Sequence, residues 1–522
     1  MKILDCGAHD GYVALWLARR LREQGHEVQV DGIELNADAV EVARRRFADE
    51  DFAGEFAVGD ALDVASHVQF EPGSYDAVIA FEVIEHVPEP QALLEALETM
   101  CKPDGAVYIS TPDGTFGTGQ NPHHLRVFRA VDLADLLRRR GQLRDMVVGH
   151  DGVTAAAYTP IERRGEIAIY AGPGWETWSP HDIESRGLGG SETAAIRLAQ
   201  QLSEIGYVVT VYGEVEQCAF RDVIYRHHSV FDPMERRLAV IASRIPEVGD
   251  RHINARSRLL WMHDTDAGDR LTAARAEAFD HVLVLSRWHE EHVSGMYPFL
   301  RGRLRQTRNG IEHSYFAGET PERKKRVLYT SSPDRGLDIL LELWPKIREQ
   351  VPDAELAYCY SEVYDRIAEK DATVAAHRER IRELAAATEG TSALGSLPQQ
   401  ELARLMRTSL VWAHPSYATP HGQPFHETSC IGAMEAQAAG CVVVASDWGA
   451  LSETVKVGRL VNSGPLSDRW RAGFVREIVD GLRNTETQKW AQIAGPKAAA
   501  DLGWGGVARQ VAGLIEGEVV EA

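Results

Sequence analysis

Short apolar runs alternate with longer amphipathic segments along most of the chain. In the first third, the apolar runs are Lys2–Cys6, Val28–Glu34, Tyr75–Phe81, Ala106–Thr111 and Asp145–Gly149. Apolar residues at helical spacing occupy Gly11–Glu23 and Asn36–Phe47, between the first of these runs. Strands separated by helices of this length form βαβ units around a parallel sheet. The pattern therefore predicts an α/β domain in this part of the chain.

The same alternation returns in two further regions. The strand candidates there are Glu166–Ala171, Val208–Tyr212, Arg258–Met262 and His281–Leu285, followed by Arg326–Thr330, Ala354–Tyr360, Leu410–Ala413, Val442–Ser446 and Val457–Val461. Polar segments that contain proline, Thr159–Gly165 and Ala317–Lys325, separate the three regions. We predict three domains, at residues 1–160, 161–320 and 321–522.

Composition narrows the class of protein. The 522 residues suggest about three domains at roughly 150 residues each, and the formal net charge of −21 argues against broad nucleic-acid binding. Six cysteines without CxxC spacing argue against a disulfide scaffold or a thiolate zinc site. Neither a membrane-spanning apolar stretch nor a signal-peptide pattern is found, so we expect a cytoplasmic protein, with peripheral membrane contact left open.

The first candidate site lies near the amino terminus. The stretch Ile3–Gly11 (ILDCGAHDG) joins a strand to a helix through a glycine-bearing turn, which lets a ligand approach the backbone and the free N–H groups of the helix. Glu34 ends the next strand, where a carboxylate can accept both hydroxyls of a ribose. Asp60 follows the third strand, near the place expected for an adenine. A purely structural strand-to-helix turn is the alternative.

Three further stretches extend this pattern, namely Tyr75–Val87 (YDAVIAFEVIEHV), Lys102–Pro112 (KPDGAVYISTP) and His124–Phe128 (HLRVF). Residues 1 to about 158 thereby resemble class I S-adenosylmethionine-dependent methyltransferases, most closely the branch that methylates oxygen or carbon of small molecules. The resemblance implies S-adenosylmethionine as cofactor. It also implies that the methionine side of the pocket is shaped by Asp5, Gly7 and Gly11, while Glu34 holds the ribose and Asp60 contacts the adenine.

Methyl transfer needs in-line alignment, and a base when the nucleophile is a hydroxyl. His86 and His124 are the candidate catalytic bases, with local packing as the alternative for each. His9 replaces the usual middle glycine of the turn, so we expect its side chain to point away from the cofactor. The sequence also begins at the first strand, without the helices that precede it in this family. Both departures leave open a domain that binds or scaffolds without methylating.

The second candidate site lies in the other two regions. Gly187–Glu192 (GLGGSE) leads into a helix, and Gly189 and Gly190 allow a phosphate or sugar to approach closely, although a structural turn is equally compatible. Glu427 and Glu435 stand eight residues apart in FHETSCIGAMEAQAAG. If Glu435 opens a helix, its carboxylate can chelate a ribose diol, while Glu427 faces the sugar from a loop.

This E-x7-E arrangement resembles retaining glycosyltransferases of the GT-B fold, family 4, over about residues 166–490. Matches at Ser286, Asn309-Gly310-Ile311 and Pro333–Gly336 follow the expected order. The resemblance implies two Rossmann-like domains that face each other across a cleft, with the acceptor on the first and the nucleotide sugar on the second. A terminal helix would cross back to the first. We thus predict an α/β protein with three Rossmann-like domains, a class I methyltransferase followed by a two-domain GT-B glycosyltransferase.

The resemblance also implies roles for individual residues. A UDP- or GDP-sugar would be bound by Gly189, Gly190, Asn309, Arg335, Glu427, Glu435 and Glu453. Thr330 or a neighbouring serine replaces the basic residue that normally accompanies Arg335, and the glycine amides are expected to compensate. His263, after the strand LLWMHD, is the second catalytic candidate beside Glu427. Asp264–Asp266 reads DTD, but enzymes of this fold stabilise the diphosphate without a metal, so no metal site is predicted.

The leading hypothesis is a bifunctional enzyme that transfers a sugar with retention and methylates either that sugar or its acceptor, a small molecule or glycan. One alternative is a glycosyltransferase whose methyltransferase-like domain is a non-catalytic scaffold. Another, prompted by Thr330, is that the glycosyltransferase half only senses its ligand. The sequence leaves open the donor sugar and base, the acceptor, the order of the two reactions and the oligomeric state.

Overall fold

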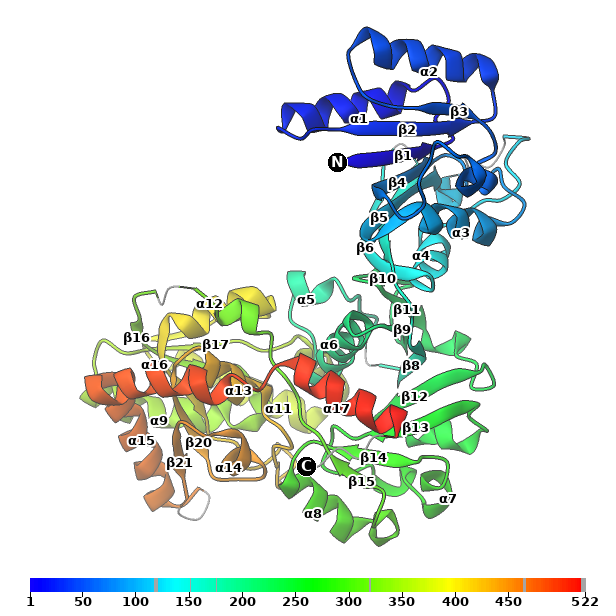
Figure 1. Cartoon of the computed structure of the whole chain (residues 1–522). Helices are drawn as coiled ribbons and strands as arrows, with labels where there is room; N and C mark the ends of the chain where they lie inside the picture. The colour runs from blue at the N-terminus through cyan, green and yellow to red at the C-terminus, as the bar shows by residue number, and fades with distance from the viewer. Residues whose placement is uncertain (117–120, 151, 175, 319–320, 463–465, 518–522) are drawn as a thin grey trace. The chain divides into compact units, whose positions relative to one another are not determined.

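The computed structural model describes residues 1–116, 121–150, 152–174, 176–318, 321–462 and 466–517. The chain forms two compact units (Figure 1). Unit 1 consists of Met1–Gly165 with the later segments Gly206–Val209 and Gln217–Ile224, and unit 2 contains the other residues. The α/β class with three mostly parallel sheets is confirmed. The domain boundaries after residues 160 and 320 remain a prediction.

Unit 1 contains a seven-stranded sheet in the order β3-β2-β1-β4-β5-β7-β6. Its strands are β1 (Lys2–Cys6), β2 (Gln29–Glu34), β3 (Phe56–Val58), β4 (Tyr75–Phe81), β5 (Cys101–Pro112), β6 (Gly141–Val148) and β7 (Val153–Pro160). The first five are parallel, but β7 runs antiparallel to both β5 and β6. The predicted linker Thr159–Gly165 is therefore wrong at its start, because β7 continues to Pro160.

Helices cover both faces of this sheet, namely α1 (Tyr12–Glu23) and α2 (Ala37–Asp49) on one and α3 (Pro90–Met100) and α4 (Ala130–Arg138) on the other. Successive strand residues point to opposite faces. Ile3 accordingly packs with residues of α1 and α2, and Leu4 with residues of α3 and α4. The Asn36 side chain accepts hydrogen bonds from the N–H groups of Asp38 and Ala39 and so begins α2.

The later segments of unit 1 belong to the same core. Ile224 is fully buried in the cluster that contains residues of α3 and α4. Asp222 accepts a hydrogen bond from the N–H of Leu143 at 2.8 Å and pairs with Arg163 at 2.7 Å. Arg163 and Asp222 are each 5% exposed, so this ion pair is shielded from water.

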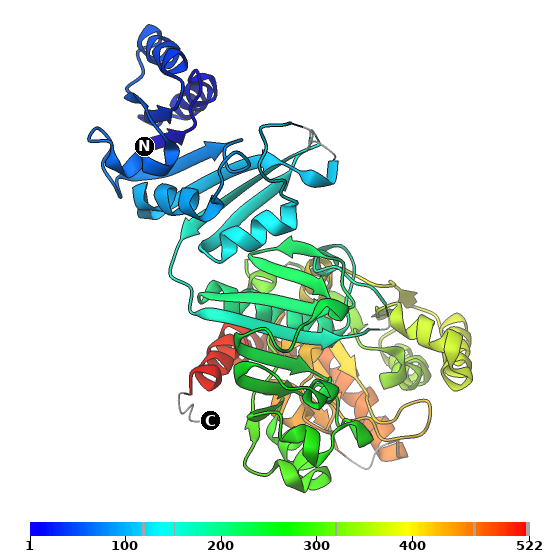
Figure 2. The ribbon, with the colours of Figure 1, turned by 90° about the vertical axis from the view of Figure 1, so that its right-hand side faces the viewer.

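The first lobe of unit 2 is built on parallel pairs of β8 (Gly165–Gly172), β12 (Arg237–Ser243), β13 (Ala255–Trp261), β14 (His281–Val284) and β15 (Leu304–Gln306). The strands β9 (Tyr207–Gly213), β10 (Cys218–Phe220) and β11 (Val223–His227) come between β8 and β12 in the chain; β10 belongs to unit 1, and β9 and β11 each belong in part to both units. Figure 2 shows the ribbon from the side. The helices of this lobe are α5 (Asp182–Ser185), α6 (Gly190–Glu204), α7 (Ala273–Ala276) and α8 (Arg287–Met296).

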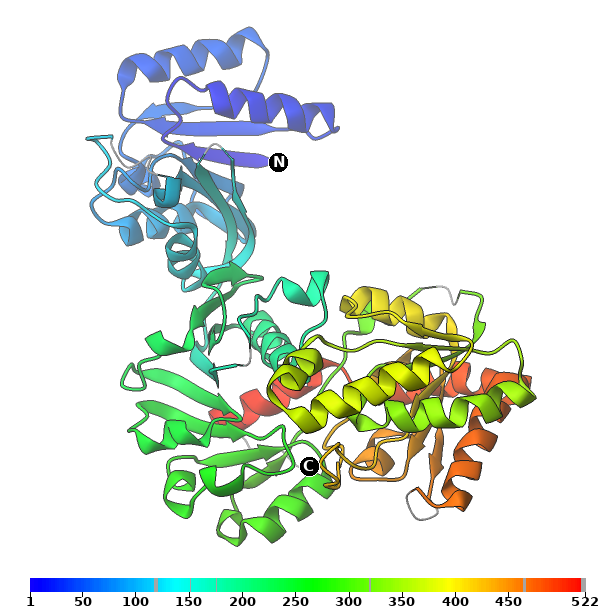
Figure 3. The same ribbon diagram turned by 180° about the vertical axis from the view of Figure 1, so that it is seen from behind.

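The second lobe contains a fully parallel six-stranded sheet in the order β18-β17-β16-β19-β20-β21. These strands are β16 (Lys324–Tyr329), β17 (Glu355–Tyr358), β18 (Thr391–Ala393), β19 (Ser409–His414), β20 (Val442–Ser446) and β21 (Arg459–Val461). Its helices are α9 (Leu337–Gln350), α10 (Val363–Lys370), α11 (Ala372–Ala386), α12 (Gln399–Arg407), α13 (Ile431–Ala438), α14 (Leu451–Thr454) and α15 (Asp468–Arg483). Figure 3 shows α9 and α11, which pack against each other.

The chain ends with α16 (Thr485–Ala499) and α17 (Trp504–Glu516). The first packs on α13 of the second lobe, whereas α17 packs on α6 of the first lobe (Figure 1). Among the described helices, none has both the length and the apolar character needed to cross a lipid bilayer.

Candidate functional site

The glycine turn of unit 1 requires glycine at two positions. Gly7 and Gly11 have φ angles of 86° and 73°, in the left-handed region that other residues rarely adopt. A Cβ atom on Gly7 would also lie 2.5 Å from Cγ2 of Val83. His9 has a φ of 46°, and its side chain is 79% exposed. The His9 imidazole is therefore largely exposed to solvent.

Glu34 and Asp5 place two carboxyl groups beside this turn. The Glu34 carboxylate accepts hydrogen bonds from the N–H groups of His9 and Asn36, both at 3.0 Å. Burial, helped by the charge of Glu34, raises the pKa of Asp5 to about 7. Asp60 is exposed, and its carboxylate accepts a hydrogen bond from the N–H of Leu62 at the start of the 3₁₀ helix η1 (Ala61–Ser66). The Asp5 carboxyl group beside the turn therefore gains its negative charge as the pH rises through about 7.

His86 and His124 lie together, with ring centroids 4.9 Å apart. The Nδ1 atom of His86 lies 3.0 Å from the carbonyl oxygen of His123 and must donate to it, which leaves Nε2 with its lone pair. Glu85 is 1% exposed, and neither of its carboxylate oxygens has a hydrogen-bond partner among the described residues. Glu85, His86 and His124 offer ligand atoms within 4.8 Å of one another. This cluster can supply a base or hold a divalent cation.

The first lobe of unit 2 gathers polar groups where its strands end. Gly189 precedes α6, and the hydroxyl of Ser191 in its first turn accepts a hydrogen bond from Arg244 at 3.0 Å. Arg244 also donates to Asp264 at 2.8 Å and has a φ of 66°. Ligands of α/β sheets bind at this edge of the strands. The sequence analysis missed Arg244 because it missed β12, and the only available signal was a basic residue after the apolar run RLAVIAS.

His263 follows β13 at the same edge. Its Nε2 atom is buried and has no hydrogen-bond partner among the described residues, and its ring centroid lies 4.2 Å from that of Trp261. Burial, with the nearby charge of Arg244, lowers the pKa of His263 to about 3, so the imidazole is neutral at physiological pH. The His263 carbonyl accepts a hydrogen bond from the hydroxyl of Thr428 at 3.0 Å, which brings the Glu427 loop of the second lobe beside it.

Glu427 is 7% exposed and is held by two basic side chains. His414 is fully buried, and its Nε2 lies 2.9 Å from Oε1 of Glu427, while Nη1 of Arg335 lies 3.9 Å from the same oxygen. Burial alone would raise the pKa of Glu427, but His414 and Arg335 lower it overall. The guanidinium of Arg335 lies 4.4 Å from the ring centroid of Phe425. The sequence analysis missed both His414 and Phe425.

Glu435 lies in the middle of α13, so the condition that it opens a helix is not met, and its predicted contact with a ribose rests on the family resemblance alone. The helix begins at Ile431, because Cys430 has an extended backbone and its carbonyl accepts the N–H of Met434. Burial raises the pKa of Glu435 to about 7, against the opposing charge of Arg197 on α6. The hydroxyl of Thr330 accepts a hydrogen bond from the indole N–H of Trp412 at 2.9 Å.

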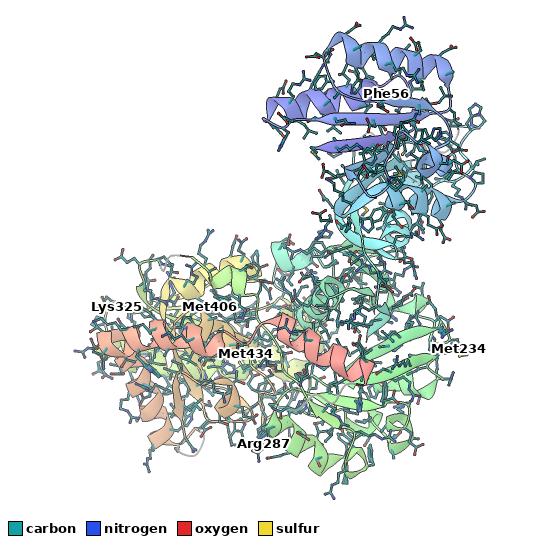
Figure 4. All side chains as sticks on the ribbon, in the orientation of Figure 1. Phe56, Met234, Arg287, Lys325, Met406 and Met434 are labelled. Atoms are coloured by element: carbon teal, nitrogen blue, oxygen red, sulfur yellow. The ribbon has the colours of Figure 1, made fainter. Side chains whose placement is uncertain are left out.

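Three other predicted residues, or their neighbours, make contacts between the two lobes. Glu453 accepts hydrogen bonds from the N–H groups of Arg287 at 2.9 Å and Trp288 at 2.6 Å, at the start of α8 (Arg287 is labelled in Figure 4). The amide of Asn309 donates to the Ser429 carbonyl at 3.1 Å, next to the Glu427 loop. In the glycine loop of Gly189 and Gly190, the N–H of Gly187 donates to the Ser396 hydroxyl at 3.0 Å. These contacts close the lobes on each other.

Aromatic rings reinforce this closure. Trp288 of the first lobe stacks with His292 of the same helix and with His426 of the second lobe, with ring centroids 4.9 Å apart in both pairs. The two histidine centroids lie 6.1 Å from each other, so the three rings form one cluster. His426 in turn stacks on Trp448 at 4.8 Å. Because His426 directly precedes Glu427, this stack connects the closure of the lobes with the position of the Glu427 loop.

Comparisons with known families match two parts of the chain. Residues 1–143 match the family described as "Methyltransferase domain", and residues 324–484 match "Glycosyl transferases group 1". The chain carries a methyltransferase domain and a group 1 glycosyltransferase domain. The resemblance to a methyltransferase and a GT-B glycosyltransferase is thereby confirmed.

Curated relatives match the methyltransferase domain. A ubiquinone biosynthesis O-methyltransferase of Pectobacterium carotovorum is 34% identical over 110 residues, which cover 21% of this chain and 42% of the relative. The namesake enzyme of Xanthomonas euvesicatoria is 28% identical over 184 residues, 32% of this chain and 70% of the relative. The chain thus spans less than half the length of the first of these relatives.

Solved glycosyltransferase structures share the fold over 68% of the chain. Sucrose-phosphate synthase of Thermosynechococcus elongatus is 17% identical with a TM-score of 0.52, and a glycosyltransferase of Rickettsia africae is 14% identical with a TM-score of 0.50. Each match covers 99% of the solved chain. At this level of identity, the likeness concerns the two-lobed fold alone.

Proposed function

We propose that the protein is a bifunctional transferase that transfers a sugar from a nucleotide sugar, with retention, and a methyl group from S-adenosylmethionine to that sugar or its acceptor. The observation that supports it is the group of Glu427, His414 and Arg335, of which Glu427 and His414 are buried. Thr428, next to Glu427, donates a hydrogen bond to the His263 carbonyl. The group combines a carboxylate for sugar hydroxyls with a cation for a leaving diphosphate in one place.

In the sugar transfer, Glu427 binds hydroxyls of the donor sugar and Glu435 binds the ribose of its nucleotide. The bond between the anomeric carbon and the diphosphate breaks, and the acceptor oxygen forms its bond on the same face of the sugar. Arg335 and the N–H groups at the start of α6 stabilise the charge on the leaving diphosphate, which accepts the acceptor proton. His263 is neutral and orients the substrate instead of carrying charge.

In the methyl transfer, the carboxylate of Glu34 binds the ribose of the cofactor, and Asp60 binds its adenine. Asp5, Gly7 and Gly11 shape the methionine side of the pocket. Nε2 of His86, whose other ring nitrogen is fixed by the carbonyl of His123, accepts the proton of an acceptor hydroxyl, and His124 is the second candidate. A divalent cation held by Glu85 with both histidines is the alternative means of activating that hydroxyl.

The test uses two variants of the full chain, Glu435→Ala and Glu34→Ala, with a panel of nucleotide sugars and S-adenosylmethionine. Nucleotide-sugar turnover is measured as release of nucleoside diphosphate, and cofactor binding by calorimetry with S-adenosylhomocysteine. Glu435→Ala is expected to lose sugar turnover while it still binds S-adenosylhomocysteine, and Glu34→Ala the reverse. If both variants match the wild type in both measurements, the proposal fails.

The same panel decides between the proposal and a scaffold role for the first domain, which His9 in the glycine turn favours. A wild-type protein that turns over a nucleotide sugar but does not bind S-adenosylhomocysteine would be a glycosyltransferase with a non-catalytic methyltransferase-like domain. The two proposed ways of activating the acceptor hydroxyl respond differently to EDTA. A base at His86 needs no cation, whereas activation by a divalent cation is lost when EDTA removes it.

A further inference from the structure

One carboxylate in the first lobe of unit 2 is shared by two adjacent histidines. Glu214 comes directly after β9, His227 is the last residue of β11, and His228 begins the 3₁₀ helix η3 (His228–Val230). Neighbouring residues of a strand point to opposite faces. Here the chain leaves the strand after His227, so that both imidazoles reach the same carboxylate.

The three side chains are spaced like ligands of one ion. Nε2 of His227 lies 3.2 Å from Oε1 of Glu214, and Nε2 of His228 lies 3.2 Å from Oε2. The candidate ligand atoms of the three residues all lie within 4.8 Å of one another. Two ligands at about 2.05 Å from a tetrahedral zinc ion are separated by about 3.3 Å, which is close to both measured nitrogen–oxygen distances.

We propose that Glu214, His227 and His228 bind one zinc-type divalent transition-metal ion. Two imidazoles and one carboxylate suit Zn²⁺ and its transition-metal neighbours better than Mg²⁺ or Ca²⁺, which prefer oxygen ligands alone. Three protein ligands leave a fourth position of a tetrahedral ion for water or an oxygen of a ligand. The side chains are 44%, 23% and 25% exposed for His227, His228 and Glu214, so this position faces solvent and ions can enter.

The contact around His227 supports this assignment. Its second ring nitrogen, Nδ1, lies 2.7 Å from the hydroxyl oxygen of Ser229. Histidines that bind metals generally donate their other ring N–H to such an acceptor, which orients the ring. Nδ1 also accepts the N–H of Ser229 at 3.3 Å when the ring proton lies on Nε2. Binding of the ion to Nε2 of a neutral His227 therefore moves the ring proton to Nδ1, where the Ser229 hydroxyl oxygen accepts it, and the Ser229 N–H is released.

None of the three residues has a role in the transferase machinery proposed above, and the test needs no substrate. The full chain, stripped with EDTA and desalted, is titrated with Zn²⁺ in competition with a chromophoric chelator, and Co²⁺ is used as a spectroscopic probe. The variants are His227→Ala/His228→Ala and Glu214→Gln. His252→Ala, an exposed histidine of the same lobe, is the matched control. Circular dichroism verifies that each variant is folded.

We expect the wild type and His252→Ala to bind one more tight equivalent of Zn²⁺ than the double variant. Glu214→Gln, which keeps both imidazoles, is expected to bind this equivalent at least about 10-fold more weakly. The same equivalent must persist in His86→Ala/His124→Ala, because that pair belongs to unit 1. The proposal is overturned if the double variant binds as many equivalents as the wild type with equal affinity, or if its Co²⁺ spectrum is unchanged.

Discussion

The charge of Glu435 is predicted to control the binding of the nucleotide sugar near neutral pH. Burial raises the pKa of this carboxyl group to about 7, although Arg197 opposes the shift. A ribose diol donates hydrogen bonds, and it therefore favours the ionised carboxylate over the carboxylic acid. Affinity for the nucleotide sugar should rise with pH through neutrality, and Glu435→Gln should remove this rise because its amide does not titrate.

The size of the effect follows from the pKa. For a pKa of about 7, the ionised fraction is about 0.09 at pH 6 and about 0.9 at pH 8, so the affinity should rise about 10-fold. The pH dependence of folding stability has the opposite sign to that of affinity. The folded pKa lies above the ordinary value of 4.5, so stability from the protonated group is complete below pH 4.5 and is lost as the pH rises through about 7.

Three buried groups of the two lobes have pKa values below this pH window. Burial lowers the pKa of His263 to about 3 and that of His289 to about 4, while the pKa of Glu427 lies below its ordinary value. Calorimetry at pH 6, 7 and 8 with an intact nucleotide sugar is the suitable assay, because both of its phosphates are esterified. Glu369→Gln, an exposed glutamate on α10, is the matched control.

Two results would refute the reasoning. The first is a wild-type affinity that does not change between pH 6 and pH 8. The second is a 10-fold rise that persists in Glu435→Gln, because another group would then carry the titration. A rise in the wild type and Glu369→Gln that is absent in Glu435→Gln supports a direct contact between this carboxylate and the ligand.

Three further predictions concern other residues of the sites. The affinity for S-adenosylmethionine should rise about 10-fold from pH 6 to pH 8, because ionised Asp5, with a pKa of about 7, attracts the sulfonium. Asp5→Asn should flatten this rise, which calorimetry measures. Glu453→Gln should raise the KM for the nucleotide sugar about 10-fold in steady-state kinetics, because charge-assisted hydrogen bonds across the lobes are lost. His414→Phe should lower kcat/KM for sugar transfer about 100-fold, since Glu427 loses its buried donor.

Each of these has a clear opposing outcome. Equal slopes in Asp5→Asn and the wild type would mean that another group near the cofactor titrates. An unchanged KM in Glu453→Gln would show that donor binding does not depend on the contact of Glu453 with the start of α8. Glu291→Gln, on α8 itself, is the control. Full kcat/KM in His414→Phe would show that Glu427 is positioned without its buried partner.

Much of the fold follows from the hydrophobic pattern, but not all. The strands Lys2–Cys6 and Tyr75–Phe81 were predicted with the bounds that the structure has, since their apolar runs are continuous and end in turns. The pattern missed β7, whose sequence VTAAAYTP is rich in small residues and reads like the start of a linker. It also missed β12 (RLAVIAS), a short apolar run between two arginine-bearing segments.

The candidate sites divide in the same way. Glu427 and Arg335 were found because they belong to local motifs, but their environment depends on contacts across the chain. His414 gives no signal of its own, since a single histidine after an apolar strand resembles any buried histidine. The partners of Glu453 stand about 165 residues earlier, so only the folded arrangement of the lobes reveals that its carboxylate caps α8.

The composition of unit 1 constrains how the two activities can be separated. Unit 1 contains the buried Ile224 and the carboxylate of Asp222, which contacts Leu143 and Arg163. Both residues follow the first strands of the glycosyltransferase half in the sequence. A gene cut after Gly165 would therefore remove part of the methyltransferase core and expose what it covered. During synthesis, this unit is complete only once the ribosome has passed residue 224. The two compact units are therefore interleaved along the sequence.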